Sequence, residues 1–177
     1  MVMAKMSKKK LKLKQVEIEP KLFFAVRIRG SPGMSTKTED TLKMLRLHKV
    51  NHGVLIWGTK SMLGMLKKVK DFIAFGEIDE KTLVRLLRVR GRLEGDKPLN
   101  DEHIQFLTDY KTIKEFAKDL HQGKIKYSSE YLYKVKPVFR LHPPIKGHRG
   151  SIKKAFNEGG TLGYVGDYIN QLIHKMI

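Results

Sequence analysis

An alternating segment near the start of the chain restricts the possible folds more than any other feature of the sequence. Residues 22–29 have the two-residue period of a strand: Leu22, Phe24, Val26 and Ile28 share one side, and Phe23, Ala25, Arg27 and Arg29 share the other. Gly30 ends this strand, and a Ser-Pro-Gly turn follows it. The chain must therefore cover at least one face of a sheet.

Two helices and two further strands are predicted after this turn. Thr36 and Glu39 have the spacing of a capping box, which predicts a helix from Thr36 to about His48. Residues 54–57 predict a second strand, residues 62–69 a second helix and residues 72–75 a third strand. Residues 22–76 thus predict a compact β-α-β-α-β unit, in which both helices cover one face of a three-stranded sheet and the other face stays open.

The remainder of the chain is predicted to be helical, apart from one basic segment. Apolar spacing predicts a helix that ends before Gly91, a short helix around residues 104–107, a helix opened by Thr112, and a last helix behind Asp167 as its N-cap. Prolines and glycines prevent residues 136–154 from forming a regular helix, so we expect an extended segment, called here the basic ribbon.

These elements predict an α+β fold with four parts. They are a basic N-terminal arm (residues 1–20), a sheet core (21–78), a helical extension (79–130), and the basic ribbon with the last helix (131–177). At 177 residues the chain is long enough to bury a sizeable core without disulfides.

Positive charge is distributed unevenly over these parts. The formal net charge is +18, of which residues 1–70 carry +13, residues 71–130 carry −1 and residues 131–177 carry +6. No acidic residue occurs between Glu130 and Glu158, and such a block repels itself unless a polyanion neutralises it. We therefore expect both ends of the chain to contact nucleic acid, and the neutral middle to face water or a protein.

Sequence patterns argue against several other functions. Without cysteine the chain has no disulfide, thiolate nucleophile or cysteine zinc site, which is consistent with a reducing intracellular setting. His48 and His52 stand four apart without a nearby carboxylate, so no metal site is expected. The glycines before the last helix match neither a dinucleotide nor a P-loop fingerprint, and no acid–base pair is evident. No enzyme activity, cofactor, small-molecule substrate or membrane span is predicted.

Three groups of residues are predicted to bind RNA. The arm contributes lysines, although a solvated tail or a nuclear-address-like run is an alternative for it: Lys8, Lys9, Lys10, Lys12 and Lys14. The sheet core contributes residues at a strand end and at helix starts, where solvated surface charge is the alternative: Arg27, Arg29, Ser31, Lys37 and Lys60. The basic ribbon contributes cations and imidazoles: Arg140, His142, Lys146, His148, Arg149, Lys153 and Lys154.

Several motifs resemble one ribosomal family. Segments 27–33 (RIRGSPG), 41–47 (TLKMLRL) and 64–69 (GMLKKV) look like the core of the large-subunit ribosomal protein L-thirty family. Segments 73–77 (IAFGE), 90–98 (RGRLEGDKP), 139–144 (FRLHPP) and 158–160 (EGG) resemble its long archaeal form, which is related to eukaryotic L-seven. The resemblance spans nearly the whole chain.

This resemblance implies a ferredoxin-like sheet core with a helical extension and no catalytic activity. It also implies a cytoplasmic, structural component of the large ribosomal subunit, bound to large-subunit ribosomal RNA near the 5S RNA. Neighbouring ribosomal proteins would contact the neutral helical extension. A paralogous assembly factor that binds precursor RNA is the alternative, and an RNA-modifying enzyme is a more distant one that would need a cofactor loop or an acid–base pair.

Overall fold

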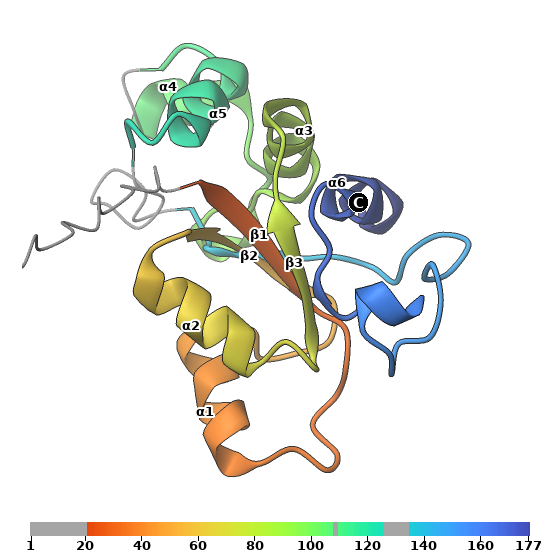
Figure 1. Ribbon diagram of the computed structural model, residues 1–177. Helices are drawn as coiled ribbons and strands as arrows, with labels where there is room; N and C mark the ends of the chain where they lie inside the picture. The colour runs from red at the N-terminus through yellow and green to blue at the C-terminus, as the bar shows by residue number, and fades with distance from the viewer. Residues whose placement is uncertain (1–20, 108–109, 126–134) are drawn as a thin grey trace, which may run out of the picture.

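The fold is α+β, with a five-stranded sheet between two layers of helices (Figure 1). The computed structural model describes residues 21–107, 110–125 and 135–177, so the N-terminal arm, with the five lysines predicted to bind RNA, lies outside the described residues. The strands are β1 (Leu22–Arg27), β2 (His52–Trp57), β3 (Ile73–Glu77), β4 (Val138–Arg140) and β5 (Gly163–Tyr164). The helices are α1 (Thr36–Met44), α2 (Lys60–Lys68), α3 (Glu80–Arg90), α4 (Asp101–Leu107), α5 (Ile113–His121) and α6 (Tyr168–Met176).

The sheet has the order β4-β2-β1-β3-β5, with β1 at its centre. Strands β2 and β3 both pair with β1 in the antiparallel sense, which confirms the three predicted core strands. Two short edge strands were not predicted. Strand β4, from the basic ribbon, pairs antiparallel with β2, and β5 pairs parallel with β3.

Helices α1 and α2 cover one face of the sheet, as the sequence predicted. Phe23 and Ala25 of β1 point into this layer, where they form an apolar cluster with Leu42 of α1 and Leu66 of α2. Because each helix presents one apolar stripe, burying these stripes against the sheet stabilises both layers together.

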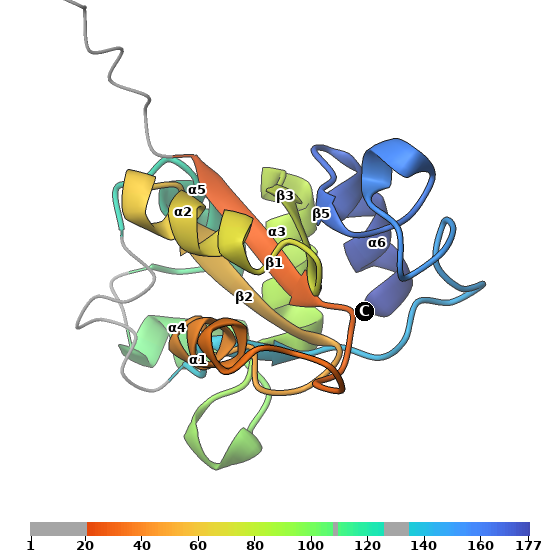
Figure 2. The same cartoon turned by 60° about the horizontal axis from the view of Figure 1, so that its bottom comes forward.

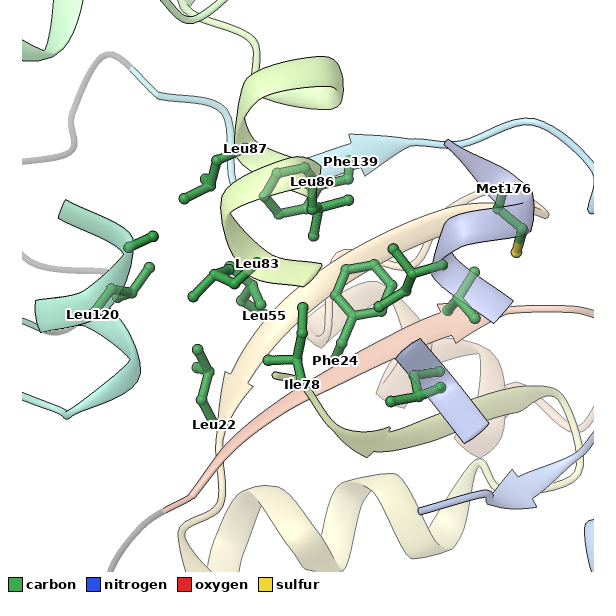
Figure 3. Close-up of a cluster of buried hydrophobic side chains, with 14 of the residues drawn as sticks. Leu22, Phe24, Leu55, Ile78, Leu83, Leu86, Leu87, Leu120, Phe139 and Met176 are labelled. Atoms are coloured by element: carbon green, nitrogen blue, oxygen red, sulfur yellow. The ribbon is translucent and has the colours of Figure 1, made fainter. Parts of the chain in front are cut away.

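The prediction that the second face stays open is wrong. Helices α3, α5 and α6 cover it, and their side chains form one cluster with Leu22, Phe24 and Val26 of β1 (Figure 3). Phe24 is fully buried and lies with its ring centroid 6.1 Å from that of Phe139 in β4. The helical extension therefore shares one core with the sheet.

Helix α1 begins and ends differently from the prediction. Its N-cap is Ser35 and not Thr36, and the Ser35 side chain bonds the Thr38 hydroxyl at 2.9 Å in place of a backbone N–H. The helix ends at Met44 because a Schellman motif closes it: Arg46 adopts φ +60°, and the N–H of Leu47 donates to the carbonyl oxygen of Leu42. Glycine usually holds this left-handed position, and because the sequence has Arg46 there, the end of the helix could not be predicted.

Three other predicted helix boundaries agree with the structure. Thr112 caps α5 by accepting a hydrogen bond from the N–H of Glu115 at 3.3 Å, and Gly91 is the C-cap of α3. Asp167 precedes α6 as predicted, but its side chain makes no capping hydrogen bond.

Candidate nucleic-acid interface

Four segments that are distant in sequence meet at one end of the sheet, where β1 ends. Backbone hydrogen bonds join them: the N–H of Arg29 donates to Phe72, the N–H of Asn51 to Arg27, and the N–H of Leu141 to Asn51. The turn after β1, the loop before β2, the loop before β3 and the start of the basic ribbon are therefore held side by side. We call this region the strand-end surface.

Arg27 lies inside this region and not on its surface. The residue is 3% exposed. Its guanidinium donates hydrogen bonds of 2.9 Å to the carbonyl oxygens of Arg29, Leu47 and His48, and to the hydroxyl of Ser31. Burial lowers the pKa of Arg27. Its charge is used to hold the turn after β1 against the loop before β2, which replaces the phosphate-docking role expected from the sequence.

Arg29 is the next cation on the same turn, and it is half-buried. Its guanidinium carbon lies 5.1 Å from the ring centroid of Phe72, and its Nη1 donates to the Asp71 carbonyl oxygen at 3.2 Å. These two contacts orient the side chain while leaving part of it accessible. Ser31 is exposed beside it and receives the hydrogen bond from Arg27.

Several basic side chains lie near His52 at the start of β2. Arg140 lies directly across from it in β4, and His48 and Lys49 precede it in the adjoining loop. Burial, followed by the positive charge of these neighbours, lowers the pKa of His52. The fold therefore gathers basic side chains around His52, which neither His48 nor Lys49 alone would have indicated from the sequence.

Arg140 is balanced by one carboxylate. Asp96, from the 3₁₀ turn Glu94–Asp96, accepts a hydrogen bond from Arg140 at 3.2 Å and another from Lys136. These cations lower the pKa of Asp96, with the Lys136 hydrogen bond as the largest cause. The exposed Arg140 side chain is thus paired with Asp96, an acid from outside the basic ribbon.

The two lysines predicted at helix starts do not join one edge of the sheet. Lys60 follows Trp57, which pairs with Leu22 at the opposite end of β1 from Arg29. The prediction that the cations of Lys37 and Lys60 cluster with the strand-end arginines is therefore wrong for Lys60. Lys37 is exposed in the first turn of α1, which follows the turn after β1.

Beyond β4 the basic ribbon runs past the end of α6 (Figure 2). The backbone N–H groups of His142 and Ile145 donate to the carbonyl oxygens of Met176 and Lys175, at 3.1 and 2.9 Å. Residues 141–154 form no helix, as predicted, but turns interrupt the expected extended segment. These hydrogen bonds fix the first part of the ribbon against the body of the protein. It then returns through the 3₁₀ turn Phe156–Glu158 to edge strand β5.

The imidazoles of the ribbon face the protein. His142 has one ring nitrogen 2.8 Å from the Pro143 carbonyl oxygen and the other 2.7 Å from the backbone oxygen of Ile177. His148 is half-buried, and burial lowers its pKa. Lys146, between them, is exposed and adopts φ +63° at the tip of a turn. Of these three predicted contacts, only Lys146 presents its charge outward.

The far part of the ribbon carries three exposed cations. Lys153 and Lys154 are exposed, and so is Arg149, whose guanidinium carbon lies 4.5 Å from the ring centroid of Phe156 and 5.9 Å from that of Tyr168. None of the three forms an ion pair within the described residues. These side chains are thus free to meet an external anion.

Other kinds of site find little support in the part of the chain that the structure describes. It contains no group of three histidine or acidic side chains arranged to hold a metal ion. None of its helices is long and apolar enough to cross a bilayer. The described residues instead form two basic surfaces, which the basic ribbon connects. They are the strand-end surface and the far part of the ribbon, with Arg149, Lys153 and Lys154.

Comparisons with known proteins identify the family of the chain. A family model described as Ribosomal protein L30p/L7e matches residues 23–73, which span β1 to the start of β3. Relatives called large ribosomal subunit protein uL30 are 50% identical in Methanoculleus marisnigri and 50% identical in Archaeoglobus fulgidus, each over 155 residues. Another, from Methanococcus maripaludis, is 48% identical over 156 residues. Each alignment covers 88% of this chain and 99% of the relative. The chain therefore belongs to the L30p/L7e family of ribosomal proteins.

Proposed function

We propose that this protein stabilises folded ribosomal RNA in the large subunit by neutralising phosphates with cations of the strand-end surface and the basic ribbon. One observation carries the proposal: exposed cations of segments 29–49 and 140–154 lie on backbone that the fold holds in place, whereas residues 71–130 between them have a net charge of −1. Phosphate neutralisation releases counterions, so such contacts give strong and salt-dependent binding.

The ordering of the ribbon supports shape recognition in addition to charge. Backbone hydrogen bonds to α6 and pairing of β4 with β2 hold the cations at set positions before RNA binds. Preorganised side chains lose less conformational entropy on binding than those of a disordered tail. Large-subunit RNA in the neighbourhood of the 5S RNA is the proposed ligand, and the cytoplasm is the proposed compartment.

The neutral helical extension is the proposed contact for neighbouring ribosomal proteins. Residues 71–130 have a net charge of −1, which provides little attraction for RNA. Helices α3 and α5 of this extension use their apolar stripes against the sheet, and their other faces are exposed. We expect polar protein contacts there.

Charge reversal tests the RNA-binding surface. Changing Arg140, Arg149, Lys153 and Lys154 together to Glu should abolish binding to deproteinised large-subunit RNA and incorporation into large subunits. A matched control makes the same change of charge at four exposed cations of α3 and α5: Lys81, Arg88, Lys114 and Lys118. The control should retain RNA binding, and normal incorporation of the ribbon variant would refute the proposal.

A paralogous assembly factor is the second candidate, because it would use the same surfaces on precursor RNA. Gradient sedimentation of a cell lysate at moderate and high salt distinguishes the two. A stoichiometric, salt-resistant presence in mature large subunits would establish the structural role. Restriction to precursor particles would establish the assembly factor.

A further inference from the structure

The far end of the basic ribbon contains a stacked group that phosphate binding does not require. Phe156, in the 3₁₀ turn, lies with its ring centroid 5.5 Å from that of Tyr168 at the start of α6. Arg149 lies over Phe156 at 4.5 Å. An isolated lysine would neutralise a phosphate equally well, whereas a planar guanidinium held over an aromatic ring presents a flat surface.

Close backbone packing holds this group in place. A Cβ atom at Gly150 would overlap the carbonyl oxygen of Gly159, and one at Gly160 would overlap that of Lys154. The N–H of Phe156 donates to Leu162 at 2.9 Å, which ties the turn to the segment that leads into β5. The residue next to Arg149 is therefore fixed by contacts that only glycine permits.

The outer side of the arginine remains available. Arg149 is exposed, although Phe156 and Tyr168 beneath it are half-buried. The described residues supply no carboxylate to Arg149, and the nearest charged residues along the ribbon are Lys146, Lys153 and Lys154. A ligand that stacks on Arg149 would thus arrive with its negative charge beside several cations.

We propose that Arg149, supported by Phe156 and Tyr168, is a stacking site for one unpaired base of bound RNA. Proteins recognise unstacked bases on aromatic rings and on arginine planes, whereas bases inside a duplex have no free face. The neighbouring lysines would contact the phosphates on either side of that base. This inference rests on the proposed function, because it names the RNA feature that the ribbon would select.

Three RNA hairpins with one stem sequence provide the test. The first carries 2-aminopurine as a single bulged base, the second carries an abasic residue at the bulge, and the third pairs the 2-aminopurine within the stem. Affinity is measured with the full chain at several salt concentrations, together with 2-aminopurine fluorescence. The bulged base should bind at least about fivefold more tightly than the abasic bulge, the low end of the range for stacking on a protein side chain. Binding should also change its fluorescence.

Two substitutions separate stacking from charge. Arg149→Lys keeps the charge but removes the guanidinium plane, so the advantage of the bulged base should disappear while the salt dependence remains. Lys153→Ala removes one charge but leaves the stack, so the advantage should remain while the salt slope falls by about one.

The outcomes distinguish the two proposals. Equal affinity for the bulged and abasic hairpins, with strong salt dependence, would refute the stacking site and leave the phosphate mechanism intact. An undiminished advantage in Arg149→Lys would also refute it. Salt-independent binding, or none to any hairpin at low salt, would refute the phosphate mechanism and the stacking site with it.

Discussion

Replacing Arg27 with methionine tests whether this arginine stabilises the fold or contacts RNA. Methionine can replace the apolar stem of arginine as far as Nε, but it cannot donate the four hydrogen bonds made by the guanidinium. The carbonyl oxygen of Leu47 would lose a buried partner, whereas those of Arg29 and His48 lie where water can partly replace the donor.

The expected loss of stability follows from these burial differences. Leaving one buried acceptor unsatisfied costs about 1–3 kcal/mol, and each partly buried hydrogen bond contributes about 1 kcal/mol. Arg27→Met should therefore lower the free energy of unfolding by about 4 kcal/mol or more, a large part of the roughly 5–15 kcal/mol typical of a domain. Arg29→Met is the matched control, and its exposed contacts should cost about 1 kcal/mol or less.

Denaturant unfolding and RNA binding together provide the assay. Arg27→Met should shift the unfolding midpoint strongly without changing the slope of log affinity against log salt concentration. Arg29→Met should reduce that slope by about one and shift the midpoint little. If Arg27→Met left the midpoint unchanged and reduced the salt slope, Arg27 would be a phosphate contact, and the structural role argued for it would be wrong.

Two further predictions concern packing and pH. Gly76→Ala should destabilise the fold by about 3 kcal/mol because the added Cβ would overlap the carbonyl oxygen of Gly166, whereas Gly64→Ala, in open space on α2, should stabilise it by up to about 1 kcal/mol; thermal unfolding checks both. The pKa values of His52 and His148 lie below the ordinary 6.5 in the folded protein, so the unfolded chain binds more protons as the pH falls through that value. Unfolding free energy should therefore decrease from about pH 7.5 to about pH 5.5, and less steeply in His148→Gln.

The three central strands could be predicted from the sequence because their signals are local. Alternation, turn residues and three-and-four spacing each involve neighbours in the chain. The edge strands could not be found in this way, since β4 has three residues and β5 has two, and each exists only through pairing with a distant strand. Their flanking prolines and glycines also conceal a strand.

The sequence does contain evidence that helices cover the second face of the sheet. Residues 22–26 are all apolar, so the sequence alone predicts that both faces of β1 are hydrophobic. A strand with one face in water normally alternates with polar residues, and one buried on both sides does not. The apolar stripe of α5, including Phe116 and Leu120, equally required a partner surface, and the open face of the sheet was the available one.

Candidate site residues were harder to place because a charged side chain gives no local sign of what it contacts. Arg27 and Arg29 are two positions apart and fall on the same side of the predicted strand. One donates to four protein acceptors and the other reaches the surface, and the difference arises from the loop before β2, which supplies Leu47 and His48. The inward turn of His142 likewise depends on the end of α6.

The basic ribbon contains no acidic residue, but the fold brings an acidic residue from another segment next to it. Asp96 lies outside the ribbon, and it contacts both Lys136 and Arg140 at the ribbon's start. A phosphate would have to compete with this carboxylate for Arg140, whereas the cations of Lys153 and Lys154 have no ion pair within the described residues. Because attraction to RNA depends on uncompensated charge, the far part of the ribbon should contribute more to phosphate binding than its start. A count of charges along the chain treats the two parts as equal, and only the folded arrangement separates them.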